Sequence, residues 1–395
     1  MNYDFETLID RGNQGAAKWE LMKAQAPDVP KGVVPLSVAD MEFVNAPEIR
    51  AALHRFLDEG VLGYGCMTDR YRAAVCGWMQ RRHAFPAQPE WIVPSPGVVP
   101  ALYYAVRACT APGDGVIVPT PVYYPFFAAV EKNGRRVVRC PLINRGERYE
   151  FDFDALEAAA RQRENTLLLL CSPHNPVGRV WTERELSRLS DICLEHHVFV
   201  VADEIHHDLI LPGHRHTVYA GLSAAAADNC ILCTAPSKTF NIAGLQASNI
   251  LVPNAAVRAR LEAEMGKSGA GELNVMGGVA CEAAYNEGAA WLDALLLKIQ
   301  ENADLCKGFL ADNVPGVRAY PLEGTYLQWW DCRGLGLPQE KLIALLEGEA
   351  LLFSDDGALF GPEGAGFVRV NLACPTRVLE AVLSRVRDAV CRAAQ

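Results

Sequence analysis

A lysine and an aspartate carry the most specific chemistry that this sequence suggests. Lys238 lies in the segment Ala235-Pro-Ser-Lys-Thr-Phe-Asn241, and Asp203 precedes it in the chain. A lysine amine can form a Schiff base with an aldehyde cofactor, and an aspartate can keep a pyridine nitrogen protonated. Because pyridoxal 5′-phosphate (PLP) needs both groups, the pair predicts a PLP site if the fold brings the two side chains together.

Short apolar runs predict the strands that would position these residues. Continuous apolar runs of this length are typical of strands buried on both faces of a sheet. The runs occupy residues 115–119, 166–171, 198–202, 230–233 and 248–252. Helical patterns cover residues 154–163 and 182–196, and the second begins with the capping box Thr182-Glu-Arg-Glu185. This alternation predicts an α/β sheet covered by helices.

The pattern changes after about residue 285, and we expect a second domain there. This part of the sequence contains a long helical stretch at residues 289–313, a strand-like segment at residues 324–330 and a terminal helix at residues 376–394. A chain of 395 residues is long enough for two or three domains. We expect a large α/β domain over residues 48–285 and a smaller α+β domain built from residues 1–47 and 286–395.

Polar residues follow the predicted strands at their carboxyl ends, where ligands bind in open α/β sheets. Asn175, Asp203 and Lys238 each follow a different apolar run, and Tyr123 and Tyr124 follow another. Independent surface residues would rarely fall at these positions together. The sequence therefore predicts that these side chains meet at one edge of the sheet.

Composition argues against several classes of function. The net charge of −10 and the pI of about 5.5 argue against binding to nucleic acids or to anionic membrane surfaces. We expect no signal peptide and no membrane span, because neither pattern is visible. The 13 scattered cysteines are typical of reduced thiols in a cytoplasmic protein.

Two local patterns resemble metal or redox motifs but do not support a site. Cys230 and Cys233 match a C-x-x-C motif, but in a strand their thiols would point to opposite faces. The pairs His196-His197 and His206-His207 are adjacent, and neighbouring residues do not easily converge on one ion. We therefore predict no metal site.

A set of motifs in fixed order spans residues from about 36 to 375. Three of them are Ser172-Pro-His-Asn-Pro-Val-Gly178, Ala202-Asp-Glu-Ile-His206 and the segment around Lys238. The others lie at residues 38–43, 63–65, 95–101, 324–326 and 367–371. The set resembles fold-type I PLP-dependent enzymes, and more narrowly the MalY/PatB family of cystathionine β-lyases, the cystalysin-like C–S lyases. This resemblance implies an aspartate aminotransferase-like fold with a mostly parallel sheet in its large domain.

The resemblance also implies roles for the polar residues around the cofactor ring. Lys238 would hold PLP and, once substrate displaces it, remove the proton from the substrate Cα. Asp203 would pair with the pyridinium nitrogen. Asn175 would donate to the phenolic oxygen of the ring, and Tyr123 would stack on its face.

Further residues would bind the phosphate and the substrate. The resemblance assigns the phosphate to a helix start, where unpaired N–H groups and the helix dipole favour an anion. The implied phosphate ligands are Gly97, Val98, Val99, Ser237, Tyr124 and, from the neighbouring subunit of a homodimer, Tyr64. Arg369 would pair with the α-carboxylate of an amino-acid substrate. Asp40 and Tyr124 would help to shape the substrate pocket.

Two departures from the aminotransferase pattern favour a lyase. Many aminotransferases of this fold have a tyrosine where this chain has His206, and a phosphate-binding arginine where it has Gln246. Both departures agree with the C–S lyase pattern. We therefore predict β-elimination from L-cysteine S-conjugates, for example L-cystathionine to homocysteine, pyruvate and ammonia. An aminotransferase, or a regulatory or binding protein that keeps the fold, remains an alternative, although the intact polar set argues against the latter.

Overall fold

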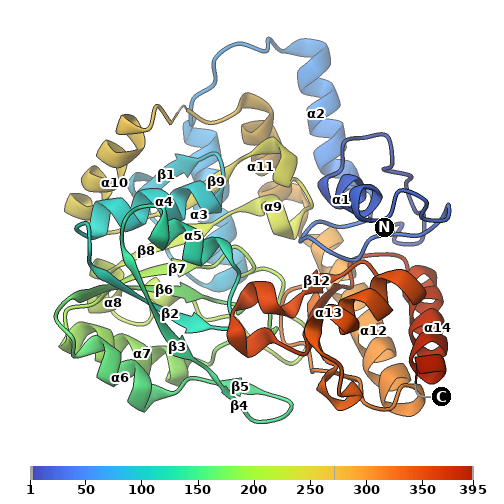
Figure 1. Cartoon of the computed structure of the whole chain (residues 1–395). Helices are drawn as coiled ribbons and strands as arrows, with labels where there is room; N and C mark the ends of the chain where they lie inside the picture. The colour runs from blue at the N-terminus through green and yellow to red at the C-terminus, as the bar shows by residue number, and fades with distance from the viewer. Residues whose placement is uncertain (1–2, 271, 394–395) are drawn as a thin grey trace.

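A seven-stranded mixed sheet forms the centre of the larger part of the molecule (Figure 1). The structure, a computed structural model, describes residues 3–270 and 272–393. The strand order is β1-β9-β8-β7-β6-β2-β3, in which β9 is antiparallel to both neighbours and the other pairings are parallel. The bounds are β1 Ile92–Ser95, β2 Gly115–Thr120, β3 Arg136–Pro141, β6 Asn165–Cys171, β7 Phe199–Asp203, β8 Cys230–Thr234 and β9 Ser248–Leu251.

All five apolar runs of the sequence are strands of this sheet, which confirms the prediction of a mostly parallel α/β sheet. Strands β1 and β3 were not predicted. They are the two edge strands, and β3 carries exposed and half-buried side chains, including Arg136 and Arg139, in place of a continuous apolar run. In β1 the short stretch is interrupted by Pro94, which an edge strand tolerates.

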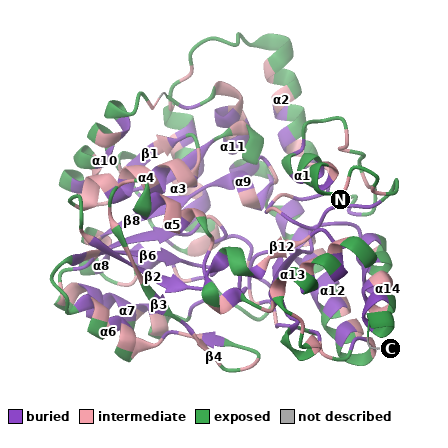
Figure 2. Ribbon diagram, viewed as in Figure 1, coloured by how far each residue is buried: buried purple, intermediate pink, exposed green. Residues whose placement is uncertain are grey.

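Alternate residues of the central strands pack into two apolar cores, one on each face of the sheet. Cys230 and Leu232 lie in the first core, whereas Ile231 and Cys233 lie in the second. The prediction that the two thiols point to opposite faces is therefore confirmed, and the central strands are buried throughout (Figure 2). This burial on both faces explains why these strands read as continuous apolar runs.

Helices cover both faces of the sheet (Figure 1). The second core contains residues of α4 (Val98–Cys109), α5 (Pro125–Glu131) and α10 (Ala255–Lys267). The first core contains residues of α3 (Asp69–His83), α6 (Phe153–Ala160), α7 (Glu183–Glu195), α8 (Ala224–Asp228) and α11 (Val275–Glu287). The predicted capping box is present, because Thr182 accepts from the Glu185 N–H while the Glu185 carboxylate accepts from the Thr182 N–H.

A smaller antiparallel sheet follows in the chain, with the order β10-β11-β13-β12. The predicted long and terminal helices are confirmed as α12 and α14, whereas the predicted strand begins only at Leu327 because residues 324–326 form a bend before it. The bounds are α12 Ala289–Asn313, β10 Arg318–Ala319, β11 Leu327–Asp331, α13 Gln339–Ala344, β12 Asp355–Asp356, β13 Phe367–Asn371 and α14 Thr376–Ala393.

The N-terminal segment packs against both parts of the chain. The first core runs without a break from Phe5 through the large sheet to Val390 in α14. The proposed domain boundaries near residues 48 and 286 remain a prediction. The remaining elements are α1 Ala17–Gln25, α2 Pro47–Glu59, β4 Ile143–Asn144, β5 Tyr149–Glu150 and α9 Pro236–Thr239. None of the helices within the described ranges has the length and apolarity that a membrane span requires.

Candidate active site

A cavity of about 760 Å³ lies at the carboxyl ends of the parallel strands. The ladder holds Cys171 at the end of β6, Asp203 at the end of β7 and Cys233 in β8 side by side. The first residues of the loops that follow these strands therefore lie next to one another at this edge of the sheet. Of the predicted site residues, the cavity brings together Gly97, Val98, Val99, Tyr123, Asn175, Asp203, Ser237 and Lys238. Asp40, Tyr64, Tyr124 and Arg369 do not line it.

The Lys238 amine is held by a backbone carbonyl. Its Nζ donates to the Ala39 carbonyl oxygen at 2.7 Å, and the Tyr326 hydroxyl donates to the same oxygen at 2.9 Å. Burial disfavours the ammonium form and lowers the pKa of Lys238 to about 8, although the Asp40 charge acts against this shift. About a tenth of the amine is therefore neutral, and thus nucleophilic, at about pH 7.

Two β-branched residues with left-handed backbones flank this contact. Val38 has φ 54° and precedes Ala39, and Thr325 has φ 71° and precedes Tyr326. A β-branched residue in this region costs about 1–3 kcal/mol and persists only when its surroundings fix it. Asn371 supplies part of that restraint, because its Nδ2 donates to the carbonyl oxygens of Val38 at 2.7 Å and Asp40 at 2.6 Å. The backbone beside Lys238 is therefore strained and held in place.

The buried Asp203 carboxylate matches the requirement for a pyridinium partner. Its Oδ1 accepts from the Ile205 N–H at 3.1 Å, the one hydrogen bond to this side chain among the described residues. Burial raises the pKa of Asp203 to about 7, whereas the positive charge of Lys238 lowers it. A protonated ring nitrogen in the cavity would satisfy this carboxylate and keep it ionised.

Asn175 connects the cavity to Arg369. The Arg369 guanidinium on β13 donates through Nη1 to Asn175 Oδ1 at 2.8 Å. Because arginine can only donate, the amide oxygen of Asn175 faces Arg369 and its NH₂ group is available to a ring oxygen in the cavity. Arg369 also donates to Asp355 Oδ2 through Nε at 3.1 Å and Nη2 at 2.6 Å. Sequence reasoning did not identify Asp355, because no motif marks it.

The start of α4, where an anion site is predicted, lines the cavity. The first-turn N–H groups of an α-helix have no acceptor within the helix, and here Gly97, Val98 and Val99 face the cavity. Ser237 and Ser248 add hydroxyl groups to the lining. Lys238 is the one lysine or arginine among the lining residues of the described chain. The residues therefore fit a phosphate that is bound mainly by neutral donors.

His206 and Gln246, the two departures from the aminotransferase pattern that favour a lyase, both line the cavity. His206 is buried, and its Nδ1 has no hydrogen-bond partner among the described residues. Burial, and then the positive charges of Lys238 and Arg369, lower the pKa of His206 well below its ordinary value. Gln246 lies on the cavity wall without positive charge. Both departures from the aminotransferase pattern therefore lie where a bound cofactor would meet them.

Tyr123 and Tyr124 occupy different environments. Tyr123 lines the cavity, and burial raises the pKa of its hydroxyl to about 12. Tyr124 is 45% exposed and packs against the Tyr123 ring with centroids 5.2 Å apart. Tyr64 is fully exposed on the segment between α2 and α3, next to the exposed Val61 and Leu62. Within this chain, Tyr64 therefore does not contribute to the cavity.

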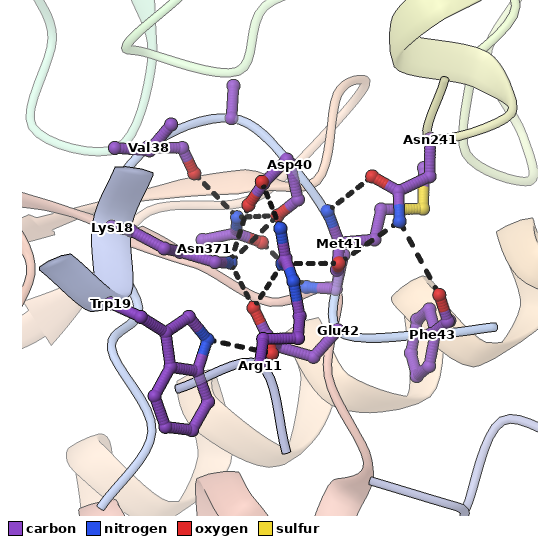
Figure 3. Close-up of polar contacts among 12 residues, drawn as sticks. Arg11, Lys18, Trp19, Val38, Asp40, Met41, Glu42, Phe43, Asn241 and Asn371 are labelled. Carbon is purple, nitrogen blue, oxygen red and sulfur yellow. Dashed lines mark hydrogen bonds and ion pairs between the residues drawn. The ribbon is translucent and has the colours of Figure 1, made fainter. Parts of the chain in front are cut away.

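Asp40 lies in an ion cluster beside the cavity (Figure 3). Its carboxylate pairs with Arg11 at 2.7 Å and Lys18 at 2.9 Å, and both cations also pair with Glu42. Burial favours the protonated acid, but the charges of Lys18 and Arg11 outweigh it and lower the pKa of Asp40. The geometry gives Asp40 a role in fixing the segment that carries Ala39 rather than a place in the cavity wall.

Comparisons with known proteins agree with this site. The family model described as aminotransferase class I and II matches residues 31–386. The chain is 44% identical to cystathionine β-lyase PatB of Bacillus subtilis, over 90% of this chain and 92% of that protein. It is 32% identical to protein MalY of Escherichia coli, over 98% and 99%. The crystal structure of cystalysin from Treponema denticola, which contains pyridoxal 5′-phosphate, matches with a TM-score of 0.98 and 45% identity over 100% of both chains.

Proposed function

Since the chain belongs to the class I and II aminotransferase family, and within it to the MalY/PatB group, we propose that it catalyses β-elimination from L-cysteine S-conjugates. Its fold is fold-type I and its cofactor is PLP. The reaction on L-cystathionine consumes one water and gives homocysteine, pyruvate and ammonia. The convergence of Lys238, Asp203 and Asn175 on one cavity, with Arg369 hydrogen-bonded to Asn175, is the observation that carries the proposal.

Lys238, Asp203 and Asn175 have two kinds of role in this proposal, binding the cofactor and transferring a proton. When bound, PLP supplies an electron sink that stabilises negative charge developing at the substrate Cα. Lys238 would hold the cofactor through Nζ and, once substrate had displaced it, would take the Cα proton. Asp203 would keep a proton on the ring nitrogen, and Asn175 would donate to the ring oxygen. The sulfur substituent then leaves from Cβ as a thiolate.

The test of the proposal is the product pattern. Purified holoenzyme incubated with L-cystathionine is expected to release pyruvate and free thiol in equal amounts. Pyruvate is assayed by reduction with lactate dehydrogenase and the thiol with a disulfide reagent. An aminotransferase on the same scaffold would instead exchange amino groups between amino acids and keto acids. Robust keto-acid exchange without thiol release would contradict the lyase proposal.

Arg369 is proposed to bind the substrate α-carboxylate. Arg369→Lys removes the planar two-donor geometry but keeps the charge. We expect kcat/KM for L-cystathionine to fall about a hundredfold, mainly through a higher KM, because the carboxylate is bound before and during reaction. Steady-state kinetics provide the measurement, with Arg318→Lys on the exposed surface as the matched control. An unchanged KM would place the carboxylate elsewhere.

The pKa of Lys238 predicts how the cofactor-free protein takes up PLP. Only the neutral amine attacks the aldehyde, and with a pKa of about 8 this form decreases about tenfold for each pH unit below that value. The rate of reconstitution is therefore expected to rise with pH and to level off above about pH 8. Stopped-flow absorbance after mixing with PLP measures it. A rate that keeps rising to about pH 10 would show an ordinary, unshifted lysine.

A homodimer would give the exposed Tyr64 its predicted role at the phosphate of the other subunit. The exposed Leu62–Tyr64 segment, which lies outside the active-site cavity of its own chain, supports this proposal. A mixed dimer of Lys238→Ala and Tyr64→Ala subunits contains one site with both native residues. We expect it to recover about half of the native activity per dimer, at limiting PLP. No recovery in the mixed dimer would place Tyr64 in its own subunit's site, and native activity of the Tyr64→Ala homodimer would place it outside both sites.

An amino-acid substrate follows from the family. The cytoplasmic location remains a prediction, and it is supported by the 13 cysteines, all of which are free thiols in the described residues. A purely regulatory or binding function is the less supported alternative, since Lys238, Asp203, Asn175 and Tyr123 line one cavity.

A further inference from the structure

A cluster of buried titratable side chains joins the end of α3 to the loop after β7, and the proposed reaction does not use it. His83 is the last residue of α3, and His207 and Asp208 follow β7. One ligand atom from each of His83, His207 and Asp208 lies within 4.8 Å of the other two. We call these residues the His83–His207–Asp208 cluster. It borders a second cavity, of about 690 Å³, that is separate from the active site.

His207 presents an unpaired ring nitrogen to this cluster. Its Nδ1 lies 2.6 Å from the Glu204 carbonyl oxygen, which can only accept, so Nδ1 carries the proton. In the neutral ring the Nε2 lone pair then faces Asp208 Oδ1 at 3.4 Å. This nitrogen is buried and has no hydrogen-bond partner among the described residues. Two acceptors in contact repel each other, and a cation between them would satisfy both.

Asp208 and His83 are already fixed in place. His83 Nε2 lies 2.7 Å from Asp208 Oδ1, and the Trp78 indole donates to the same oxygen at 2.9 Å. The other oxygen, Oδ2, accepts from the Thr239 hydroxyl at 2.8 Å. Metal-binding imidazoles and carboxylates are generally oriented by such outer contacts. Here the Glu204 carbonyl orients His207, and Thr239 orients Asp208.

We propose that His83, His207 and Asp208 bind one divalent transition-metal ion of the Zn²⁺ class. Two imidazole nitrogens and one carboxylate oxygen form a common three-ligand set for Zn²⁺, and a solvent molecule completes the tetrahedron. Bonds of about 2.0–2.1 Å place tetrahedral ligand atoms roughly 3.3 Å apart. The observed separations of 2.7 and 3.4 Å from Asp208 Oδ1 lie on either side of this value, and His83 would bind through Nε2 in place of its contact with Asp208.

Positive charges on the same cavity oppose a bare cation. Arg81, Arg82 and Arg215 line it, although Arg82 is paired with Asp293 at 2.7 Å and Arg81 donates to the Tyr285 carbonyl. These charges favour hydroxide or another small anion as the fourth metal ligand over neutral water. The sequence did not predict this site, because His83 lies far from His207 in the chain and only the fold brings them together.

The role of the ion would be structural. Asp208 contacts Thr239, which directly follows Lys238 on the short helix α9. An ion at the cluster would therefore connect α3, the loop after β7 and α9. We expect Zn²⁺ to raise the thermal midpoint of the holoenzyme, since an ion that binds only the folded state stabilises it.

Cobalt provides the direct test because tetrahedral Co²⁺ is coloured and reports its ligands. The PLP-loaded protein is used in a Cys66→Ser, Cys391→Ser background, which removes the two exposed thiols. We expect one Co²⁺ per chain, with absorption bands from green to red and no thiolate charge-transfer band. Titration with Zn²⁺ is expected to abolish these bands by displacement.

Three variants assign the ligands. His207→Asn keeps a donor for the Glu204 carbonyl, and His83→Gln keeps a donor for Asp208, so both preserve the local contacts. Each is expected to weaken Co²⁺ binding at least about tenfold and to remove the Zn²⁺-dependent shift in thermal midpoint. His54→Gln, on the exposed face of α2, is the matched control and leaves both unchanged. Far-ultraviolet circular dichroism and PLP absorbance confirm that each variant folds. No Co²⁺ bands in the parent, a thiolate band, or binding that survives both ligand substitutions would overturn the proposal.

Discussion

Replacing Lys238 with alanine is expected to lower pyruvate release from L-cystathionine by at least about a thousandfold. The substitution removes both the amine that holds PLP and the base that takes the Cα proton, and proton transfer alone contributes roughly 10²–10⁴. The visible absorbance of the bound cofactor should disappear at the same time. Coupled assay of pyruvate and an absorbance spectrum of the purified variant provide the two measurements.

The structure indicates that this variant folds. The Ala39 carbonyl keeps the Tyr326 hydroxyl as a donor, and the change removes a buried charge that burial disfavours. Lys132→Ala, at the exposed end of α5, is the matched control and should keep native activity and colour. A colourless Lys238→Ala protein that still releases pyruvate at more than about a tenth of the native rate would exclude Lys238 as the base.

Replacing Asp203 with asparagine is expected to reduce kcat for elimination by roughly 10²–10³, which corresponds to about 3–4 kcal/mol of transition-state stabilisation. The amide keeps the shape of the side chain and can still accept from the Ile205 N–H. It cannot, however, hold a proton on the ring nitrogen, so the ring withdraws charge from Cα less effectively. PLP should remain bound, because Lys238 is intact.

Measuring PLP binding and turnover separately distinguishes this role of Asp203 from simple destabilisation of the fold. Asp203→Asn should bind PLP and lose turnover, whereas an unfolded variant loses both. Glu204→Gln is the control, since Glu204 is also buried and adjacent in the chain but faces His216 and the Tyr219 N–H. Equal losses of activity in the two variants would indicate a general effect of buried carboxylates rather than a specific role of Asp203.

The cofactor side of the cavity could be predicted from the sequence because it follows from a local rule. A buried parallel strand appears as an apolar run, and the residue after its carboxyl end lies at the ligand edge. Asn175, Asp203 and Lys238 each obey that rule, and the structure brings them to one cavity. The helix start at Gly97 was instead implied by the family resemblance of the motif at residues 95–101.

The substrate side could not be predicted in the same detail, since it depends on contacts between distant segments. The Ala39 carbonyl reaches Lys238 only because Asn371 and the Arg11–Lys18–Asp40 ion pairs hold that segment. Asp355 meets Arg369 through the pairing of β12 with β13, a very short strand without an apolar pattern. No periodicity encodes such contacts, which tertiary packing alone creates.

One apolar core extends from the N-terminal segment through one face of the large sheet to the terminal helix α14. The β13 strand that carries Arg369 belongs to this core through Val368 and Val370. Because this core joins the two parts of the chain, a closing movement of the smaller sheet over bound substrate cannot be a hinge rotation about an unpacked linker. It must proceed as shear, in which packed side chains slide past one another by small steps. The same continuity couples the two parts of the chain, so that thermal denaturation is expected to be a single cooperative event in which neither part outlasts the other.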